Sequence, residues 1–184
     1  EARFIANKVQ RLVEQGINRR ETAVLYRSNA QSRVLEEAFL QSGIAYRIYG
    51  GQRFFERTEI KNALAYLRLL ANRHADAALE RVINTPTRGI GAKTVELLRE
   101  RARATGQSLW ATANQLITDG SLPGRAASSL AQFMELVNRL DLDTAGLSLA
   151  EKTEHVFQAS GLLEFHRNEK GDKGQQREEN LREL

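Results

Sequence analysis

The stretch Thr85-Pro86-Thr87-Arg88-Gly89-Ile90-Gly91-Ala92-Lys93-Thr94 places a Gly-Ile-Gly turn between two amphipathic segments. Apolar residues at helical spacing flank this turn: Leu79, Val82 and Ile83 precede it, and Val95, Leu97 and Leu98 follow it. The spacing predicts two short helices that pack together with the turn at their tip.

The Gly-Ile-Gly turn (residues 85–94) has the features of a phosphate-binding site. Glycine has no side chain and lets a ligand approach the backbone closely. The start of the next helix adds unpaired N–H donors and a positive dipole. The arrangement resembles the helix-hairpin-helix module, which grips nucleic-acid backbones without reading sequence. The alternative is a helical hairpin whose glycines serve only as a cap and a tight turn.

We predict that the turn contacts the phosphates of duplex DNA. The predicted contact residues are Thr85, Thr87, Arg88, Gly89, Ile90, Gly91, Lys93 and Thr94.

The overall composition fits an anionic partner. The 184-residue chain carries a formal net charge of +4, and Lys and Arg outnumber Asp and Glu between residues 73 and 103. It has no cysteine, and its three histidines lack metal-ligand spacing, so no metal site is expected. No apolar run approaches a membrane span and no signal peptide is present, which predicts a cytoplasmic protein without a membrane partner.

Residues 1–51 are predicted to be α/β. A helix is expected over Glu1–Gln15, followed by buried strands at Thr22–Tyr26 and Ala45–Tyr49 with a helix between them. A strand-helix-strand unit with tight turns requires parallel strands. Two parallel strands are too few to form a domain of their own, so we expect residues 1–51 to be a piece of a larger α/β domain.

Residues 52–184 are predicted to be helical, so the fold class is mainly α with a small α/β part. Helices are expected around Ile60–Asn72, on both sides of the Gly-Ile-Gly turn, and around Leu109–Ile117 and Leu130–Leu140. A capping box at Ser148–Glu151 opens a further helix, and Glu178–Leu184 begins another. The polar stretch Asn168–Gln176 is expected to be a mobile loop.

Several motifs in order along the chain resemble the UvrD/PcrA/Rep group of superfamily 1 DNA helicases, and the UvrD branch most closely. They are Ala23–Arg33, Tyr46–Gly51, Arg53–Arg57, Glu59–Lys61, Asn84–Gly91, Gly124–Ala127 and Glu169–Gly171. The resemblance covers the whole chain.

The resemblance implies that residues 1–51 are part of the second RecA-like motor domain, and that residues 52–184 are the helical accessory subdomain, of the 2B type. Such enzymes hydrolyse ATP with Mg²⁺, move 3′ to 5′ on single-stranded DNA and separate duplexes in repair and replication. The implied partners are duplex and single-stranded DNA, and repair or replication proteins.

The catalytic parts of such an enzyme are missing from the sequence. There is no Gly-x-x-x-x-Gly-Lys-Ser/Thr loop for phosphates, and no Asp-Glu pair at a strand end for Mg²⁺. We therefore expect an internal segment that binds DNA, has no catalytic residues of its own and does not hydrolyse ATP. The alternative is a stand-alone, non-enzymatic helix-hairpin-helix DNA-binding or scaffold module.

A second group of polar residues follows the first predicted strand, where open α/β sheets present ligand-binding groups. The family resemblance places these residues near the single-stranded DNA or the motor cleft. They are Arg27, Ser28, Asn29, Gln31 and Arg33. The alternative is helix capping by Ser28 or Asn29 with solvated arginines.

Two further expectations concern the α/β piece. Gly50 and Gly51 join it to the helical part and are predicted to act as a hinge, because glycines absorb large dihedral changes; a simple turn is the alternative. Its truncated sheet edges are expected to cause self-association.

Overall fold

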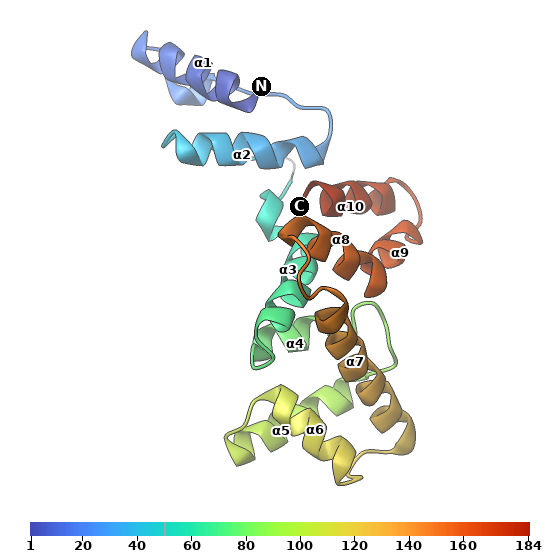
Figure 1. Ribbon diagram of the computed structural model, residues 1–184. Coiled ribbons are helices and arrows are strands. Elements are labelled where there is room, and N and C mark those ends of the chain that lie inside the picture. The colour runs from blue at the N-terminus through green and yellow to red at the C-terminus, as the bar shows by residue number, and fades with distance from the viewer. Residues whose placement is uncertain (50) are drawn as a thin grey trace. The chain divides into compact units, whose positions relative to one another are not determined.

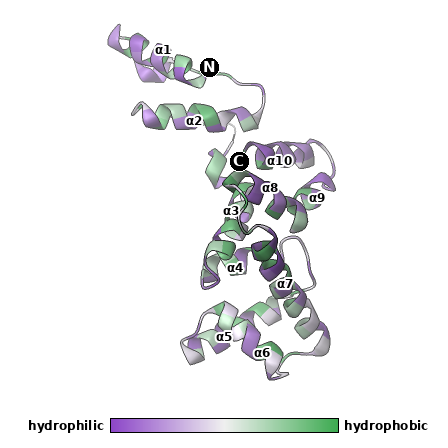
Figure 2. Ribbon diagram, in the orientation of Figure 1, coloured by the Kyte–Doolittle hydropathy of each residue, from purple (hydrophilic) through white to green (hydrophobic). Residues whose placement is uncertain are grey.

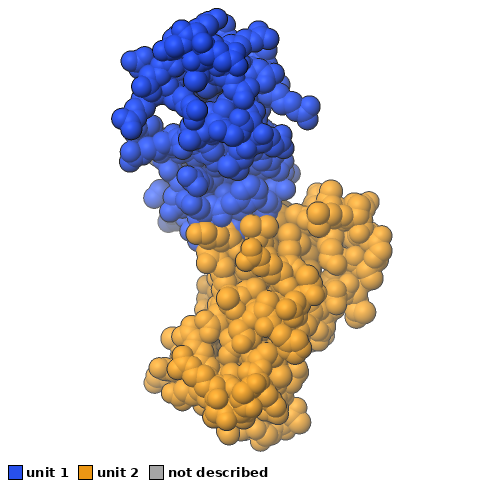
Figure 3. Space-filling model, turned by 90° about the vertical axis from the view of Figure 1, so that its left-hand side faces the viewer, with its two compact units in different colours: residues 1–60, 170–184 blue, residues 61–169 orange. Residues whose placement is uncertain are grey.

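The computed structural model describes residues 1–49 and 51–184, which divide into two compact units. Unit 1 comprises residues 1–60 and 170–184, and unit 2 comprises residues 61–169; Figure 3 colours them separately. Helix α3 (Thr58–Ala71) begins in unit 1 and continues in unit 2. Unit 1 extends to residue 60 and includes the C-terminal helix. The predicted division after residue 51 concerns the motor and accessory parts of a longer protein and stays a prediction.

Unit 1 is built on a pair of helices, α1 (Ala2–Glu14) and α2 (Ser32–Gln41), which pack against each other (Figure 1). Its core consists of Ala6, Val9, Ala38, Phe39 and Ile44. Short 3₁₀ turns complete the N-terminal part: η1 (Arg19–Glu21), η2 (Asn29–Gln31) and η3 (Phe54–Glu56). Helix α10 (Asp172–Glu183) packs against η2.

The two predicted strands do not form a sheet, and no strand occurs in residues 1–49 and 51–184. Both segments still show a period of two in their burial. Val24 and Tyr46 are partly buried against the α1–α2 core, whereas Leu25 is 94% exposed and Tyr49 is 82% exposed. The alternation of apolar and polar residues correctly indicated that each segment has one buried face. The prediction that the two segments pair as strands is wrong for the described structure. A strand needs a hydrogen-bonded neighbour, and each segment lies on helices instead.

Unit 2 is entirely helical in its regular structure. Helix α6 (Leu109–Thr118) packs against α4 (Asp76–Val82), α5 (Ala92–Thr105) and α7 (Gly124–Asp143). Helix α8 (Leu149–Ala159) packs against α7 and α9 (Leu162–Arg167). The most deeply buried side chains of this unit include Leu79, Leu98, Leu116, Leu130 and Phe133.

The helix-hairpin-helix arrangement is not confirmed. Helices α4 and α5 do flank the Gly-Ile-Gly turn, but each packs mainly on α6. A two-pronged ion pair joins them directly: Arg99 donates from Nε and Nη2 to the Glu80 carboxylate at 2.6 and 2.8 Å. This hydrogen bonding lowers the pKa of Glu80 and raises that of Arg99. The apolar spacing predicted both helices, but it did not predict which helix each would face.

The helix ends were predicted with mixed success. The capping box is confirmed, because Ser148 accepts a hydrogen bond from the Glu151 amide and the Glu151 carboxylate accepts one from the Ser148 amide. The predicted loop Asn168–Gln176 is wrong in its second half, where α10 already begins at Asp172. This helix is largely hydrophilic (Figure 2), so its sequence carries little apolar periodicity; Leu181 is its one large buried apolar side chain.

None of the helices in the described parts of the chain is long and apolar enough to span a bilayer.

Candidate nucleic-acid interface

The backbone of the Gly-Ile-Gly turn is held from inside unit 2 by two polar side chains. The Asn84 side-chain oxygen accepts hydrogen bonds from the amides of Arg88 at 2.8 Å and Ile90 at 3.3 Å. The Tyr66 hydroxyl, on the buried face of α3, donates to the Thr85 carbonyl at 2.6 Å. Neither residue was among the sequence-predicted contacts. Asn84 could have been found, because an Asn before a turn commonly binds backbone groups downstream of it.

Arg88 points its guanidinium into the protein. Nη1 donates to the carbonyl of Pro86 at 2.9 Å and, more weakly, to that of Val82 at 3.4 Å. Nη2 donates to the Ser160 carbonyl at 2.8 Å, at the junction of α8 and α9. The guanidinium also lies 5.7 Å from the centre of the Phe133 ring. From the sequence, the Arg88 guanidinium was expected to be exposed at the turn. In the structure it donates hydrogen bonds to backbone carbonyl groups instead.

The first glycine of the turn and the isoleucine after it serve the fold. Gly89 has a φ of +77°, in the left-handed region that favours glycine, and a Cβ there would lie 3.4 Å from the Ser129 Oγ of α7. Figure 1 shows this loop beside α7. The Ile90 side chain is 1% exposed and belongs to the core. The structure thus does not place Ile90 on the surface where a DNA contact was predicted.

The second glycine is different, because neither its backbone angles nor its surroundings among the described residues require glycine. Gly91 is the N-cap of α5 with φ −80° and ψ 168°, and a Cβ there would meet no atom within 4 Å. The amides of Thr94 and Val95 bond back to the Gly91 carbonyl. Within the described residues, no acceptor binds the amides of Gly91, Ala92 and Lys93, and all three residues are exposed.

The exposed rim of the turn therefore combines free amides, a cation and hydroxyls. Lys93 is exposed in the first turn of α5, which contains no acidic residue. Thr87 is exposed, and Thr85 and Thr94 are half-buried. A helix N-terminus with its positive dipole and a lysine can bind an anion, and phosphate oxygens match such donors.

Comparison with known proteins identifies the family. The UvrD-like helicase C-terminal domain matches residues 1–121. The chain belongs to the UvrD-like helicases. It is 54% identical over 184 residues to DNA helicase II of Escherichia coli strain K12, covering 100% of this chain and 26% of that protein. It is 37% identical over 185 residues to the ATP-dependent DNA helicase PcrA of Bacillus subtilis, covering 100% of this chain and 25% of that protein.

DNA helicase II of Haemophilus influenzae is also 54% identical over 184 residues. This UvrD-like chain thus spans about a quarter of the length of the relatives it matches. The matches run through the whole chain and support a helicase segment, not the alternative of a stand-alone DNA-binding module.

The second predicted group of this UvrD-like chain is engaged in local hydrogen bonds. The Gln31 side-chain oxygen accepts from the amides of Arg27 at 3.0 Å and Ser28 at 3.1 Å. Ser28 Oγ accepts from the Ala30 amide at 3.3 Å and donates to Glu179 of α10 at 3.4 Å. The side chain of Asn29 lies outside what the structure describes.

Arg33 completes this group and is also paired. Its guanidinium meets Glu37 and Glu183, each at 3.2 Å, and so joins α2 to α10. Arg27 is exposed, and its side chain makes no ion pair or hydrogen bond with the described residues. The described side chains of Ser28, Gln31 and Arg33 are thus used for contacts within unit 1.

Of the predicted hinge pair, Gly50 lies outside the described residues. Gly51 does not adopt the left-handed region, and a Cβ there would meet no atom within 4 Å. The conformation at residue 51 therefore does not itself require glycine.

A buried polar cluster in unit 1 was not predicted from the sequence. Arg57 is 8% exposed and donates to Asn180 at 2.7 Å and to Ser32 at 2.8 Å. Asn180 in turn donates to Glu59 at 2.6 Å. Burial lowers the pKa of Arg57, and the charge of Glu59 opposes this. The cluster ties the start of α3 to α2 and α10, segments far apart in the sequence.

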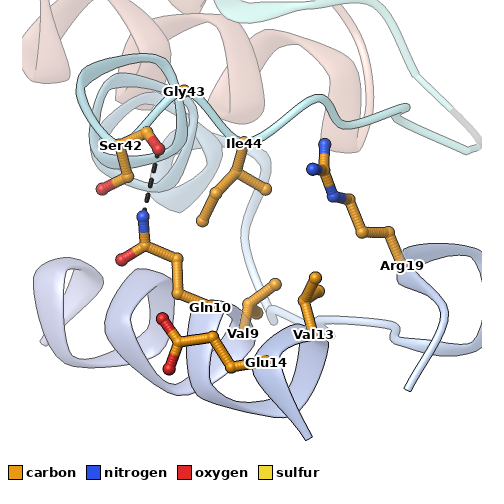
Figure 4. A pocket seen from close by; sticks show the side chains of 8 residues that line it. All are labelled: Val9, Gln10, Val13, Glu14, Arg19, Ser42, Gly43 and Ile44. Atoms are coloured by element: carbon orange, nitrogen blue, oxygen red, sulfur yellow. Dashed lines mark hydrogen bonds between the residues drawn. The ribbon is translucent and has the colours of Figure 1, made fainter. Parts of the chain in front are cut away.

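A small cavity in unit 1 offers a test of nucleotide binding. Figure 4 shows its lining, in which Ile44 lies across from Val9 and Val13, with Glu14 and Arg19 on opposite sides. The cavity measures about 150 Å³, below the several hundred Å³ of typical cofactor sites. One arginine opposite a carboxylate does not suit a triphosphate. This cavity is therefore not a candidate ATP site.

Proposed function

We propose that this chain is a segment of an ATP-driven 3′–5′ DNA helicase of repair or replication, and that unit 2 contacts duplex DNA. The observation that carries the proposal is the N-terminus of α5. Three exposed amides there have no acceptor among the described residues, and Lys93 lies beside them. In a UvrD-like chain, the phosphates of a duplex are the anions expected at such a site.

The proposed roles divide the predicted contact residues into two sets. Gly91 and Lys93 offer amides to phosphate oxygens, Lys93 adds its charge, and the hydroxyls of Thr87 and Thr94 complete the rim. Thr85, Arg88, Gly89 and Ile90 shape and support it. Contacts to phosphates fix the position of the protein on DNA but read no base directly, so binding is independent of sequence.

We also propose that residues 1–51 belong to the second RecA-like motor domain and residues 52–184 to the accessory subdomain. In the whole protein, the extended segments Thr22–Tyr26 and Ala45–Tyr49 would gain neighbouring strands. ATP and Mg²⁺ would be bound by other parts of that protein. A steady-state assay of the chain with saturating single-stranded DNA should therefore show no ATP hydrolysis. DNA-stimulated turnover that co-purifies with the chain would contradict this assignment.

The second group is proposed to face single-stranded DNA or the motor cleft, with Arg27 as its free cation in the described structure. Replacing Arg27 with alanine should then weaken single-strand binding more than duplex binding. Gly50 and Gly51 are proposed as the hinge of the accessory subdomain. Replacing both with alanine should narrow the interdomain distance distribution in single-molecule measurements on the full-length protein. An unchanged distribution would exclude the hinge.

Self-association of the isolated chain is proposed to involve its extended segments, which expose Leu25 and Tyr49. Unpaired extended backbone with exposed apolar side chains favours pairing with another chain. Light scattering should detect oligomers of the chain that disappear when residues 1–51 are removed, and a strictly monomeric chain at high concentration would contradict the proposal.

The duplex contact is tested by fluorescence anisotropy at several salt concentrations with two unrelated duplexes. Affinity should be weak, on the order of 10⁻⁴–10⁻⁶ M at physiological salt, and equal for both sequences. Lys93→Ala should lower both affinities alike and reduce the salt slope by about one.

Gly91→Val should lower affinity further, because its side chain blocks the approach to the backbone. Lys173→Ala, at an exposed lysine in unit 1, is the matched control and should change neither affinity nor slope. If Lys93→Ala and Gly91→Val both bind duplexes as the parent chain does while remaining folded, the turn has no DNA contact.

A further inference from the structure

We propose that Arg88 is a positioning residue of the Gly-Ile-Gly turn. Arg88 supports duplex binding by holding the backbone of the turn in place, and it does not itself bind a phosphate. This inference rests on the proposed duplex contact and deepens it. It assigns a role opposite to the one that the residue's charge and place beside the glycines predict.

The geometry of the guanidinium supports this role. One edge of it binds the carbonyl of Pro86, inside the turn, and the carbonyl of Val82, the last residue of α4. The other terminal nitrogen binds the carbonyl of Ser160, which is 4% exposed. Arg88 thereby fastens the turn to the α8–α9 junction, 72 residues away in the sequence.

The surroundings of Arg88 also keep its charge away from the rim. Its guanidinium lies 5.8 Å from the ring of Tyr66 and 5.7 Å from that of Phe133, both of which are buried. Delocalised, weakly hydrated guanidinium tolerates such a site better than a lysine ammonium does. A lysine also lacks the planar fork that reaches carbonyls on two sides. A lysine at residue 88 should therefore keep the positive charge but lose the hydrogen bonds that join the turn to the α8–α9 junction.

The main chain of the same residue is fixed as well. The side-chain oxygen of Asn84 accepts hydrogen bonds from the amides of Arg88 and Ile90. Asn84 therefore holds the backbone of residues 88–90, while the Arg88 side chain fastens the same segment to the α8–α9 junction. The run of three consecutive free amides begins at the next residue, Gly91. A turn that is ordered before binding loses less entropy when it meets a phosphate, and this raises affinity.

The test is a double-mutant cycle on duplex binding, measured at low salt, where binding is tight enough to quantify weakened variants. Arg88→Lys should lower duplex affinity about tenfold, a magnitude expected for losing one charge-assisted contact network, and should keep the salt slope because Lys93 still binds. In a Gly91→Val background, Arg88→Lys should cause no further loss, because the backbone contact through which it acts is already blocked.

Asn84→Ala provides a second route to the same result without touching any charge, and should also be non-additive with Gly91→Val. Arg139→Lys, on the exposed face of α7, is the matched control and should retain full affinity. Thermal unfolding checks that each variant remains folded.

The outcomes separate this inference from the proposed function. If Lys93→Ala and Gly91→Val retain duplex affinity, the duplex contact itself fails. If those variants lose affinity but Arg88→Lys and Asn84→Ala bind as the parent chain does, Arg88 is not a positioning residue. If the loss from Arg88→Lys is undiminished in the Gly91→Val background, Arg88 binds phosphate independently and the inference is overturned.

Discussion

The two glycines of the Gly-Ile-Gly turn should respond to the same substitution in opposite ways. Gly89 adopts a left-handed conformation and has Ser129 close to the place of its missing Cβ, whereas Gly91 is extended and faces open space. Alanine at residue 89 should therefore damage the fold, and alanine at residue 91 should damage only the duplex contact.

The magnitudes follow from these conformations. A left-handed alanine costs about 1–2 kcal/mol relative to its preferred conformations, so Gly89→Ala should destabilise unit 2 by about that amount. At residue 91, reduced freedom of the unfolded chain stabilises by about 0.4–1 kcal/mol. Alanine is a poorer N-cap than glycine by roughly 0.5–1 kcal/mol, which about cancels this gain. Gly91→Ala should therefore leave the free energy of unfolding within about 0.5 kcal/mol of its original value.

Urea unfolding followed by circular dichroism measures the first effect, and anisotropy with a labelled duplex measures the second. Gly91→Ala should lower duplex affinity, and Gly91→Val should lower it further, because each added carbon lies between the phosphate and the amides of α5. Gly89→Ala should instead affect stability more than binding, with a lower urea midpoint of unfolding and a smaller change in duplex affinity than Gly91→Ala.

Two results would refute this reasoning. A loss of more than about 1 kcal/mol in Gly91→Ala would mean that the fold requires glycine there, against the observed backbone angles. Unchanged duplex affinity in a folded Gly91→Val variant would mean that no ligand approaches this backbone.

Three further predictions concern stability. Burial raises the pKa of Tyr66 to about 12 from its ordinary value of 10.0, so the chain should lose stability as pH rises from 10 towards 12. Tyr66→Phe should remove that loss and, by breaking the bond to Thr85, cost about 1 kcal/mol at neutral pH; urea unfolding across this pH range is the check. Arg57→Met should destabilise unit 1 by about 3 kcal/mol, because two buried charge-assisted hydrogen bonds are lost; an unchanged urea midpoint would contradict this. Ile90→Val should cost about 1 kcal/mol in the same assay, since this side chain lies in the core, and a neutral result would place it on the surface.

Much of the local structure of this UvrD-like chain could be read from its sequence. Apolar spacing placed the helices on both sides of the turn, and Ser148 with Glu151 marked the start of α8. These features depend on residues within one or two turns of each other. The chain's family was also readable, because several motifs recur in order at consistent spacing.

The missed elements depend on partners distant in the sequence. Helix α10 has little apolar pattern, and the side chain of its Asn180 binds Arg57 and Glu59, more than 100 residues away in the sequence. The extended segments carried a strand-like period, but a period of two reports one buried face and does not supply a neighbouring strand.

For the candidate site, the sequence by itself determined the glycines, the lysine and the start of a helix, because these follow from local backbone chemistry. Only the tertiary structure decided which way each group points. Arg88 and Lys93 are both cations beside the same glycines, yet Arg88 reaches inward to the Ser160 carbonyl and Lys93 remains exposed. The sequence does not show which way a charged side chain points, and one of the carbonyls that bind this guanidinium comes from a helix junction 72 residues away.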